Sequence, residues 1–413
     1  MAKMLQNRSG SSFKVTYPLI SDLDSPVQHI SIYQEMGKQD VVEIHYPRLD
    51  PHAQSLLRTG VPVQIDWKND KVKESFYGYV MDAKPSFHSS TNRPFVVRCV
   101  GASLSLKNGG TEIWVNKSAP DVVTEIAKKF KLKPVVTPSP IILESQSMVG
   151  QSYWEKCQEL ARRIGYTCQV FGTELHFHPL DEMINRSMTV IPILSYGGPY
   201  IGPYSDVMTP TLDAFYPTTN DYSDTESYSN KEKNIFGFDP VTAKSYSSVT
   251  SPNSVGENIR GDKRAPLFEE YLPQGITASK SEALALSKAF SQLSRLSNSA
   301  KGTGQGDPRI APYRTVEIEG TSKENDGFWI VKKATHHVYH TGRYELDFEV
   351  VTDGIGGNVP SAFRPTEAGT SPTRDLTTAT TERPTRTILT STVTLVKQSD
   401  VGYKETPQRW EGM

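Results

Sequence analysis

The chain has 413 residues, enough for roughly two to four domains that each bury a core of their own. Its 45 lysines and arginines stand against 46 aspartates and glutamates, so the net charge of -1 excludes a general attraction to nucleic acid or anionic membranes. No run of about eighteen apolar residues occurs, and residues 1–10 lack the apolar core of a secretion signal. We therefore expect no stable membrane insertion, and assembly in a cytoplasm.

Residues 27 to 106 contain four runs in which apolar and polar residues alternate, a pattern typical of half-buried strands. Prolines, glycines and Asn69-Asp70 separate the runs, as turns require. We predict a first antiparallel β-barrel domain over residues 1–110. The apolar members of the runs are Val42, Ile44 and Tyr46; Val61, Val63, Ile65 and Trp67; Tyr77, Tyr79 and Met81; and Phe95, Val97 and Cys99.

A short amphipathic helix is predicted after Ser118, which stands as its N-cap, with Pro120 in the first turn. A second helix is predicted after Ser152, which forms a capping-box pattern with Glu155. The apolar face of the first helix contains Val122, Val123, Ile126, Ala127 and Phe130, and that of the second contains Trp154, Cys157, Ala161 and Ile164.

The second helix ends at Gly165, where a left-handed C-cap favours a residue without Cβ, and the strands Tyr166–Phe171 and Leu175–Phe177 follow. We expect the two helices to pack together in an α+β module over residues 111–184. Its structural core would consist of Val123, Ile126, Phe130, Trp154, Ala161, Ile164 and Gly165.

Residues 185–353 predict a second β-barrel domain, with long loops in its first half and a strand at Asn234–Pro240. Residues 277–300 are rich in Ala and Ser and predict an inserted helix. The glycines at 302, 304 and 306 then indicate a helix stop and a flexible turn. The final strands are predicted at Thr315–Glu319, Asp326–Val331 and Tyr344–Val350.

Residues 354–413 are dominated by Pro, Thr, Arg and Gly and have too few apolar residues for a packed core. We predict an extended tail whose segment Thr387–Leu395 adds a strand to the open sheet edge of a partner. The apolar residues of this docking strand are Ile388, Leu389, Val393 and Leu395. The alternative is a tail without a partner.

The sequence predicts no catalytic, cofactor-binding or metal-binding residues. His336 and His340 are four apart in a strand-like segment, about 13 Å, too far to share a zinc ion. His176 and His178 are interpreted as surface or interface histidines. The cysteines at 99, 157 and 168 are interpreted as buried reduced thiols, since they are odd in number and widely spaced. A catalytic pair built from distant carboxylates stays open.

The order of these elements resembles the phage tail baseplate hub family, which includes late control protein D-like hubs and the hub portion of type VI secretion spike proteins. The resemblance covers residues 10 to 353. It is carried by the two capped helices, the Arg163-Ile164-Gly165-Tyr166 end of the second, and the strand Asp326–Val331 followed by His336. The helix at 119–132 also resembles part of a LysM peptidoglycan-binding module.

The resemblance implies two tail-tube-like antiparallel barrels that flank a LysM-like module. It also implies a structural, non-enzymatic homotrimer in the virion. Such a trimer would join a hexameric tail tube protein to a trimeric central spike protein, contact other baseplate proteins, and line a channel in which DNA is only cargo. The alternative is a peptidoglycan-binding or cell-wall-degrading tail protein that uses the LysM-like module.

Overall fold

The computed structural model describes most of the chain up to residue 352. The described residues are 11–20, 25–49, 51–69, 72–85, 95–184, 191–197, 211–218, 231–239, 244–250, 268–271, 282–283, 296, 298–322 and 325–352. The predicted tail lies outside them.

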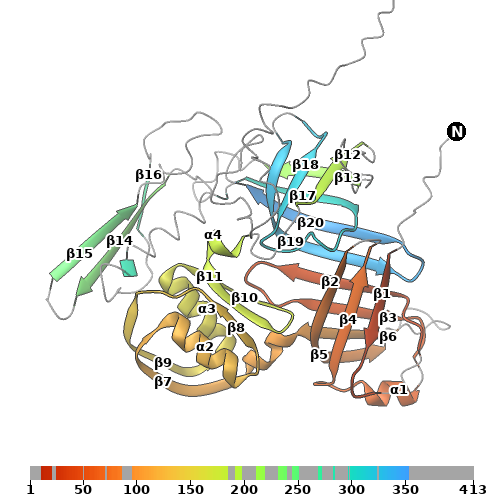
Figure 1. Cartoon of the computed structure of the whole chain (residues 1–413), viewed down its shortest axis with the longest axis horizontal. Coiled ribbons are helices and arrows are strands. Elements are labelled where there is room, and N and C mark those ends of the chain that lie inside the picture. Colours follow the sequence, from red (N-terminus) through yellow and green to blue (C-terminus); the bar gives the residue numbers. More distant parts are fainter. Residues whose placement is uncertain are drawn as a thin grey trace, which may run out of the picture. The chain divides into compact units, whose positions relative to one another are not determined.

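The first β region contributes six strands to a large sheet (Figure 1). In spatial order these are β1 (Ser12–Thr16), β4 (Pro62–Lys68), β5 (Lys73–Pro85), β6 (Phe95–Gly101), β3 (Val41–Tyr46) and β2 (His29–Glu35). A short helix, α1 (Pro51–Leu56), connects β3 to β4. The predicted alternation is confirmed in β3 and β4, where Ile44 and Ile65 are completely buried.

The alternation predicted for β5 is wrong in phase. Phe76 and Val80 point into the core, whereas Tyr77 and Met81 are 39% and 45% exposed. The inward position between Phe76 and Val80 is Gly78, where a Cβ would collide with the backbone of β6. A glycine gives no apolar signal, and tyrosines on the outer face give a false one because their polar tips tolerate water.

Residues 102–184 form the α+β part of the chain. Two helices, α2 and α3, pack against each other and against the three-stranded sheet β10-β11-β8, while β7 and β9 pair as a separate ladder (Figure 1). The elements are η1 (Ala102–Lys107), β7 (Gly109–Ser118), α2 (Ala119–Lys129), β8 (Lys133–Val136), β9 (Ile142–Ser152), α3 (Tyr153–Ile164), β10 (Tyr166–Phe171), β11 (Glu174–Pro179) and α4 (Leu180–Met183).

Capping residues determine where these helices begin and end. Ser118 accepts a hydrogen bond from the backbone of Asp121 at the start of α2. Ser152 and Glu155 form both hydrogen bonds of a capping box at the start of α3. Gly165 ends α3 with a left-handed φ of 74°. The predicted starts of both helices and the predicted end of α3 are confirmed, because each depended on a local hydrogen bond or φ angle, whereas α2 ends at Lys129 and not at residue 132.

The second β region is a closed barrel. Its ring runs β19-β18-β12-β13-β17-β20, and β20 pairs back onto β19. The strands are β12 (Ile193–Tyr196), β13 (Thr211–Thr218), β17 (Asn298–Gln305), β18 (Thr315–Glu319), β19 (Gly327–Tyr339) and β20 (Tyr344–Thr352). We predicted an antiparallel barrel, and this is wrong for one strand, since β12 runs parallel to both β13 and β18. A parallel pair requires a long connection, and a long segment separates β12 from β13.

The long strand β19 belongs to both β regions. Its residues Gly327–Ile330 pair with β18, and its residues Lys333–Tyr339 pair with β2. The two β regions therefore share a strand and form one twelve-stranded sheet (Figure 1). Among the described strands no pairing closes β1 onto β2 or β19, so only the second of the two predicted barrels is closed.

The strands described between residues 231 and 271 do not contribute to the barrel. Three strands there form a separate sheet, in which β14 pairs with β15 on one edge and with β16 on the other. The strand predicted at Asn234–Pro240 corresponds to β14. The strands are β14 (Lys231–Asp239), β15 (Lys244–Thr250) and β16 (Phe268–Tyr271).

The prediction of a helix up to residue 300 is wrong at its end, because Asn298–Ala300 begin β17. The flexible turn predicted at the three glycines is also wrong. Gly302 and Gly304 lie inside β17, which pairs with β13 and β20. A Cβ on Gly302 would lie 2.9 Å from two ring atoms of Phe348, and one on Gly304 would lie 2.5 Å from the carbonyl oxygen of Thr211. The glycines are required by close packing.

Candidate functional site

The turn between β2 and β3 lies where the first β region meets the α+β part. The side-chain amide of Gln169 donates a hydrogen bond to the carbonyl of Lys38 at 2.8 Å, and that of Gln158 donates to the carbonyl of Gly37 at 3.4 Å. The hydroxyl of Tyr313, from the second β region, is hydrogen-bonded with the backbone of Gly37. We call the bonds of Gln158 and Gln169 to this turn the turn contact.

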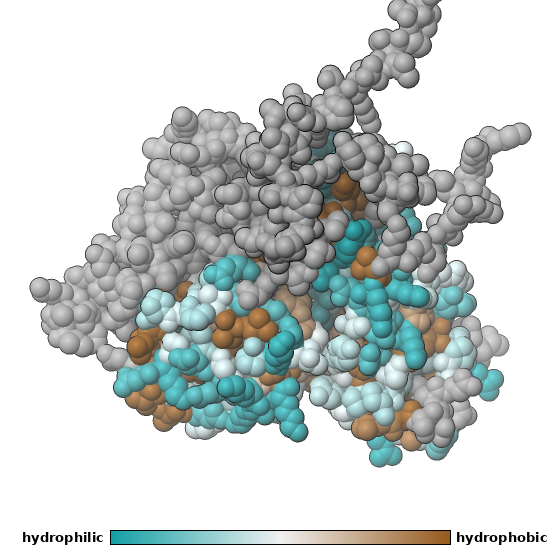
Figure 2. All heavy atoms as spheres, in the orientation of Figure 1, coloured by the Kyte–Doolittle hydropathy of each residue, from teal (hydrophilic) through white to brown (hydrophobic). Residues whose placement is uncertain are grey.

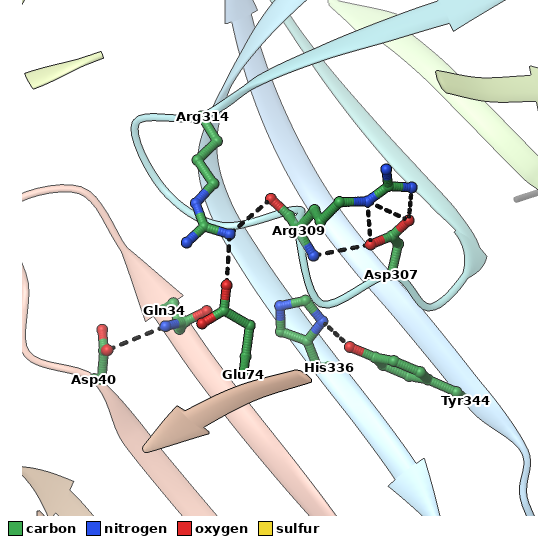
Figure 3. Close-up of polar contacts among 8 residues, drawn as sticks. All are labelled: Gln34, Asp40, Glu74, Asp307, Arg309, Arg314, His336 and Tyr344. Atoms are coloured by element: carbon green, nitrogen blue, oxygen red, sulfur yellow. Dashed lines mark hydrogen bonds and ion pairs between the residues drawn. The ribbon is translucent and has the colours of Figure 1, made fainter. Parts of the chain in front are cut away.

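Asp40 ends this turn and is buried. Its Oδ2 accepts a hydrogen bond from Nε2 of Gln34 at 3.1 Å, and its backbone carbonyl accepts one from Gly101 (Figure 3). Burial raises the pKa of Asp40 to about 7, while the Gln34 bond acts weakly in the opposite direction. Asp40 therefore titrates near neutral pH.

Arg314 connects the two β regions through polar contacts (Figure 3). Its Nη1 donates to Oε1 of Glu74, on β5, at 2.9 Å and to the carbonyl of Arg309 at 3.3 Å. Arg309 in turn pairs with Asp307, which is 1% exposed. Because Asp307 is buried, loss of Arg309 would leave its charge without compensation.

His336 and Tyr344 form a buried pair on the neighbouring strands β19 and β20. Nδ1 of His336 lies 2.9 Å from the hydroxyl of Tyr344 (Figure 3). The ring of Trp67 lies 6.3 Å from the His336 ring. Burial lowers the pKa of His336 to about 4, so the imidazole is neutral at pH 7. The pair thus fills the core between the β regions as a neutral polar contact.

A cavity of about 470 Å³ adjoins these contacts. Asp40 and Glu74 line it from the first β region, Phe171 and His176 from the α+β part, and Tyr313 from the second β region. Among the described residues, no group of three His, Cys, Asp or Glu side chains is placed to hold a metal ion.

The outward face of β7 and β9 carries four exposed apolar residues. Ile113 and Val115 on β7 are 67% and 58% exposed, and Ile142 and Val149 on β9 are 65% and 71% exposed. Hydrophobic side chains gather over these strands at the lower left of the space-filling view (Figure 2). We call these four residues the outer β7–β9 face. The alternation of apolar and polar residues would have predicted this face if β7 and β9 had been predicted as strands.

The residues predicted to form the core of the α+β module come together there. Val123, Ile126, Ala161 and Ile164 are buried in one cluster, while Phe130 and Trp154 pack against it from the rim and are only partly buried. The buried aromatic residue at the start of α3 is Tyr153, which is 3% exposed, and not Trp154. Prediction missed it because it is the first residue of α3, next to the cap.

The docking-strand residues Ile388, Leu389, Val393 and Leu395 lie outside the described residues. His176 and His178, interpreted as surface or interface residues, are buried within the described part of the chain, in β11, at 8% and 0% exposed. The two histidines are buried because the sheet face that carries them is covered. Nδ1 of His178 lies 2.8 Å from the hydroxyl of Thr137.

The three cysteines are buried free thiols, as predicted. Burial raises the pKa of Cys99 to about 12. A side-chain hydrogen bond with Cys157, together with burial, raises the pKa of Cys168. The thiols of Cys99 and Cys168 are therefore protonated at neutral pH and behave as small apolar residues.

Solved structures of tail proteins share this arrangement. A 43 kDa tail protein of prophage MuSo2 from Shewanella oneidensis superposes with a TM-score of 0.56 at 14% identity, covering 83% of this chain and 97% of that one. The chain has a phage baseplate hub-like fold. A tail protein of Neisseria meningitidis MC58 shares the fold with a TM-score of 0.53 at 11% identity, covering 80% and 93%.

The hub-like fold extends to secretion systems. An E. coli component of the type VI secretion system, itself described as similar to phage T4 tail proteins gp27 and gp5, superposes with a TM-score of 0.51 at 10% identity, covering 86% and 80%. No family model and no curated protein matches the chain by sequence. None of the helices in the described ranges is long and apolar enough to cross a membrane.

Proposed function

We propose that the chain is a structural baseplate hub of a phage or phage-like tail, without enzymatic activity. The observation that carries the proposal is the shared strand β19, which places two β regions side by side in every chain. Three copies would then present six such regions in a ring.

A ring of this kind would resolve a symmetry mismatch. Six similar regions match a hexameric tail tube, while the three-fold symmetry of the whole ring matches a trimeric central spike. The channel through the ring would pass DNA as cargo, and the protein would be located in the tail baseplate after assembly in the host cytoplasm. This chain shares its fold with the tail proteins described above over nearly their whole length, which supports this role.

The outer β7–β9 face is the proposed contact surface toward other subunits or baseplate proteins. Exposed apolar side chains gathered on one face of a ladder are typical of interaction sites, and the four residues of this face are each more than half exposed. The predicted tail strand would supply a second contact by adding to the edge of a partner's sheet.

The test is the mass of the full chain in solution, followed by binding to purified tail tube and spike proteins. We expect a trimer that binds each of the two. A monodisperse monomer at micromolar concentration that binds neither would contradict the proposal. Binding to peptidoglycan, or clearing of a cell-wall gel, would instead support the alternative of a sugar-binding or lytic tail protein.

A further inference from the structure

One oxygen of the Asp40 carboxyl group has no hydrogen-bond donor. Oδ2 is bonded to Gln34, but among the residues that the structure describes no group donates to Oδ1, which is fully buried. A buried carboxylate oxygen without a donor disfavours the charged form, because hydration is lost and nothing replaces it. A protonated carboxyl has only one oxygen that still needs a donor.

Residues that line the same cavity as Asp40 come from the part of the chain that is hydrogen-bonded to its turn. Val170, Phe171 and Gly172 line the same cavity as Asp40, and Gln169, directly before them, donates to Lys38 in the turn contact. Separation of β10 from the β2–β3 turn would therefore admit water to the carboxyl group. Closure of the turn contact and the neutral form of Asp40 therefore stabilise each other.

The other charged groups around the cavity are already engaged. From β5, Lys73 pairs with Asp66 at 3.1 Å and Glu74 with Arg314 at 2.9 Å. From β11, Glu174 pairs with Lys133 at 2.7 Å and contacts His176 at 3.3 Å. Such engaged groups give Asp40 no spare positive charge, so its own proton is the neutralising group.

We propose that Asp40 is a proton-dependent switch of the turn contact, which is closed when the carboxyl group is protonated and loosens when it ionises. The proposal does not depend on the hub function. Through it, docking of the α+β part on the first β region responds to pH in the neutral range.

The expected size follows from linkage. The pKa is about 7 in the closed state and 3.8 for a hydrated aspartate. A group whose pKa is raised on closure contributes stability at low pH and loses it as the pH rises toward the raised value. The equilibrium constant for opening should therefore rise roughly fifty-fold between pH 5 and pH 7 and level off above that.

The test is hydrogen exchange of the full chain, measured by mass spectrometry at several pH values and corrected for the intrinsic rate at each pH. We expect the protection of peptides spanning 37–40 and 158–170 to fall roughly fifty-fold from pH 5 to pH 7. The Asp40→Asn variant keeps the acceptor for Gln34 but cannot ionise, so its protection should stay constant.

Asp347→Asn is the matched control, since Asp347 lies on β20 with a side chain 58% exposed. It should follow the parent protein. Gln34→Met removes the donor to Oδ2 and should move the transition to higher pH, which keeps the proposal testable if Asp40→Asn does not fold. Unchanged protection of the parent between pH 5 and 7, or the same fall in Asp40→Asn, would overturn the proposal.

Discussion

Replacing Gly302 by alanine should destabilise the closed barrel although it adds only one methyl group. The new Cβ would lie 2.9 Å from each of two ring carbons of Phe348, its cross-strand neighbour on β20. Phe348 is 4% exposed within the barrel core, so its ring has no solvent to move into. The collision must be absorbed by shifts of β17 or β20.

The cost can be bounded from general values. Overpacking of a core typically costs about 1 to 3 kcal/mol. Alanine in place of glycine restricts the unfolded chain, which returns about 0.4 to 1 kcal/mol. The difference of these ranges is a net loss of about 0 to 2.6 kcal/mol, with a centre of about 1.3 kcal/mol, which is a measurable part of a domain stability of about 5 to 15 kcal/mol.

Urea unfolding of the parent and variant, followed by circular dichroism, measures this difference. Gly109→Ala is the control, because a Cβ there meets only a carbonyl oxygen at 3.8 Å, and it should change stability by less than about 0.5 kcal/mol. In the Phe348→Leu background, Gly302→Ala should cost less by about 1 kcal/mol. An equal midpoint for parent and Gly302→Ala, or no coupling to Phe348, would refute the packing argument.

Three further predictions follow from buried or exposed side chains. Tyr153→Ala should destabilise the α+β part by about 3 to 5 kcal/mol in thermal or urea unfolding, and Trp154→Ala by clearly less, because Tyr153 is buried in the cluster and Trp154 only partly buried; equal losses would contradict this. The lowered pKa of His336 stabilises the fold above pH 6.5, and this contribution of about 3 kcal/mol is lost as the pH falls to 4. His336→Gln should therefore lose less stability than the parent between pH 7 and pH 4 in melting curves. The control, His340→Gln, should lose as much stability as the parent. Val115→Glu, on the outer β7–β9 face, should leave the melting temperature of the subunit within a degree or two but weaken self-association in sedimentation experiments; an unchanged oligomer would remove this face from the interface.

Local signals in the sequence predicted the helices well. Ser118, Ser152 and Gly165 act through hydrogen bonds or φ angles within four residues, so their effect does not depend on the rest of the fold. The same holds for the alternation in β3 and β4, where one face is buried and the other is not.

Long-range packing could not be predicted in this way. The glycines at 302 and 304 gave the same sequence signal as a flexible turn, and only the positions of Phe348 and Thr211 explain them. The polar residues of the turn contact, Gln158 and Gln169, carry no motif, since an amide on a helix or strand is ordinarily solvated. Their role depends on a turn more than a hundred residues away.

The pairing of β2 with β19 also affects how the chain is made. Ser31 and His337 are hydrogen-bonded across 306 positions of sequence, so a nascent chain on the ribosome exposes the edge of β2 until almost all described strands have been synthesised. An open strand edge is a template for pairing with other chains, and distant contacts form slowly. Expression at lower temperature, or with chaperones that bind extended segments, should therefore raise the yield of folded protein more than stabilising substitutions within the first β region.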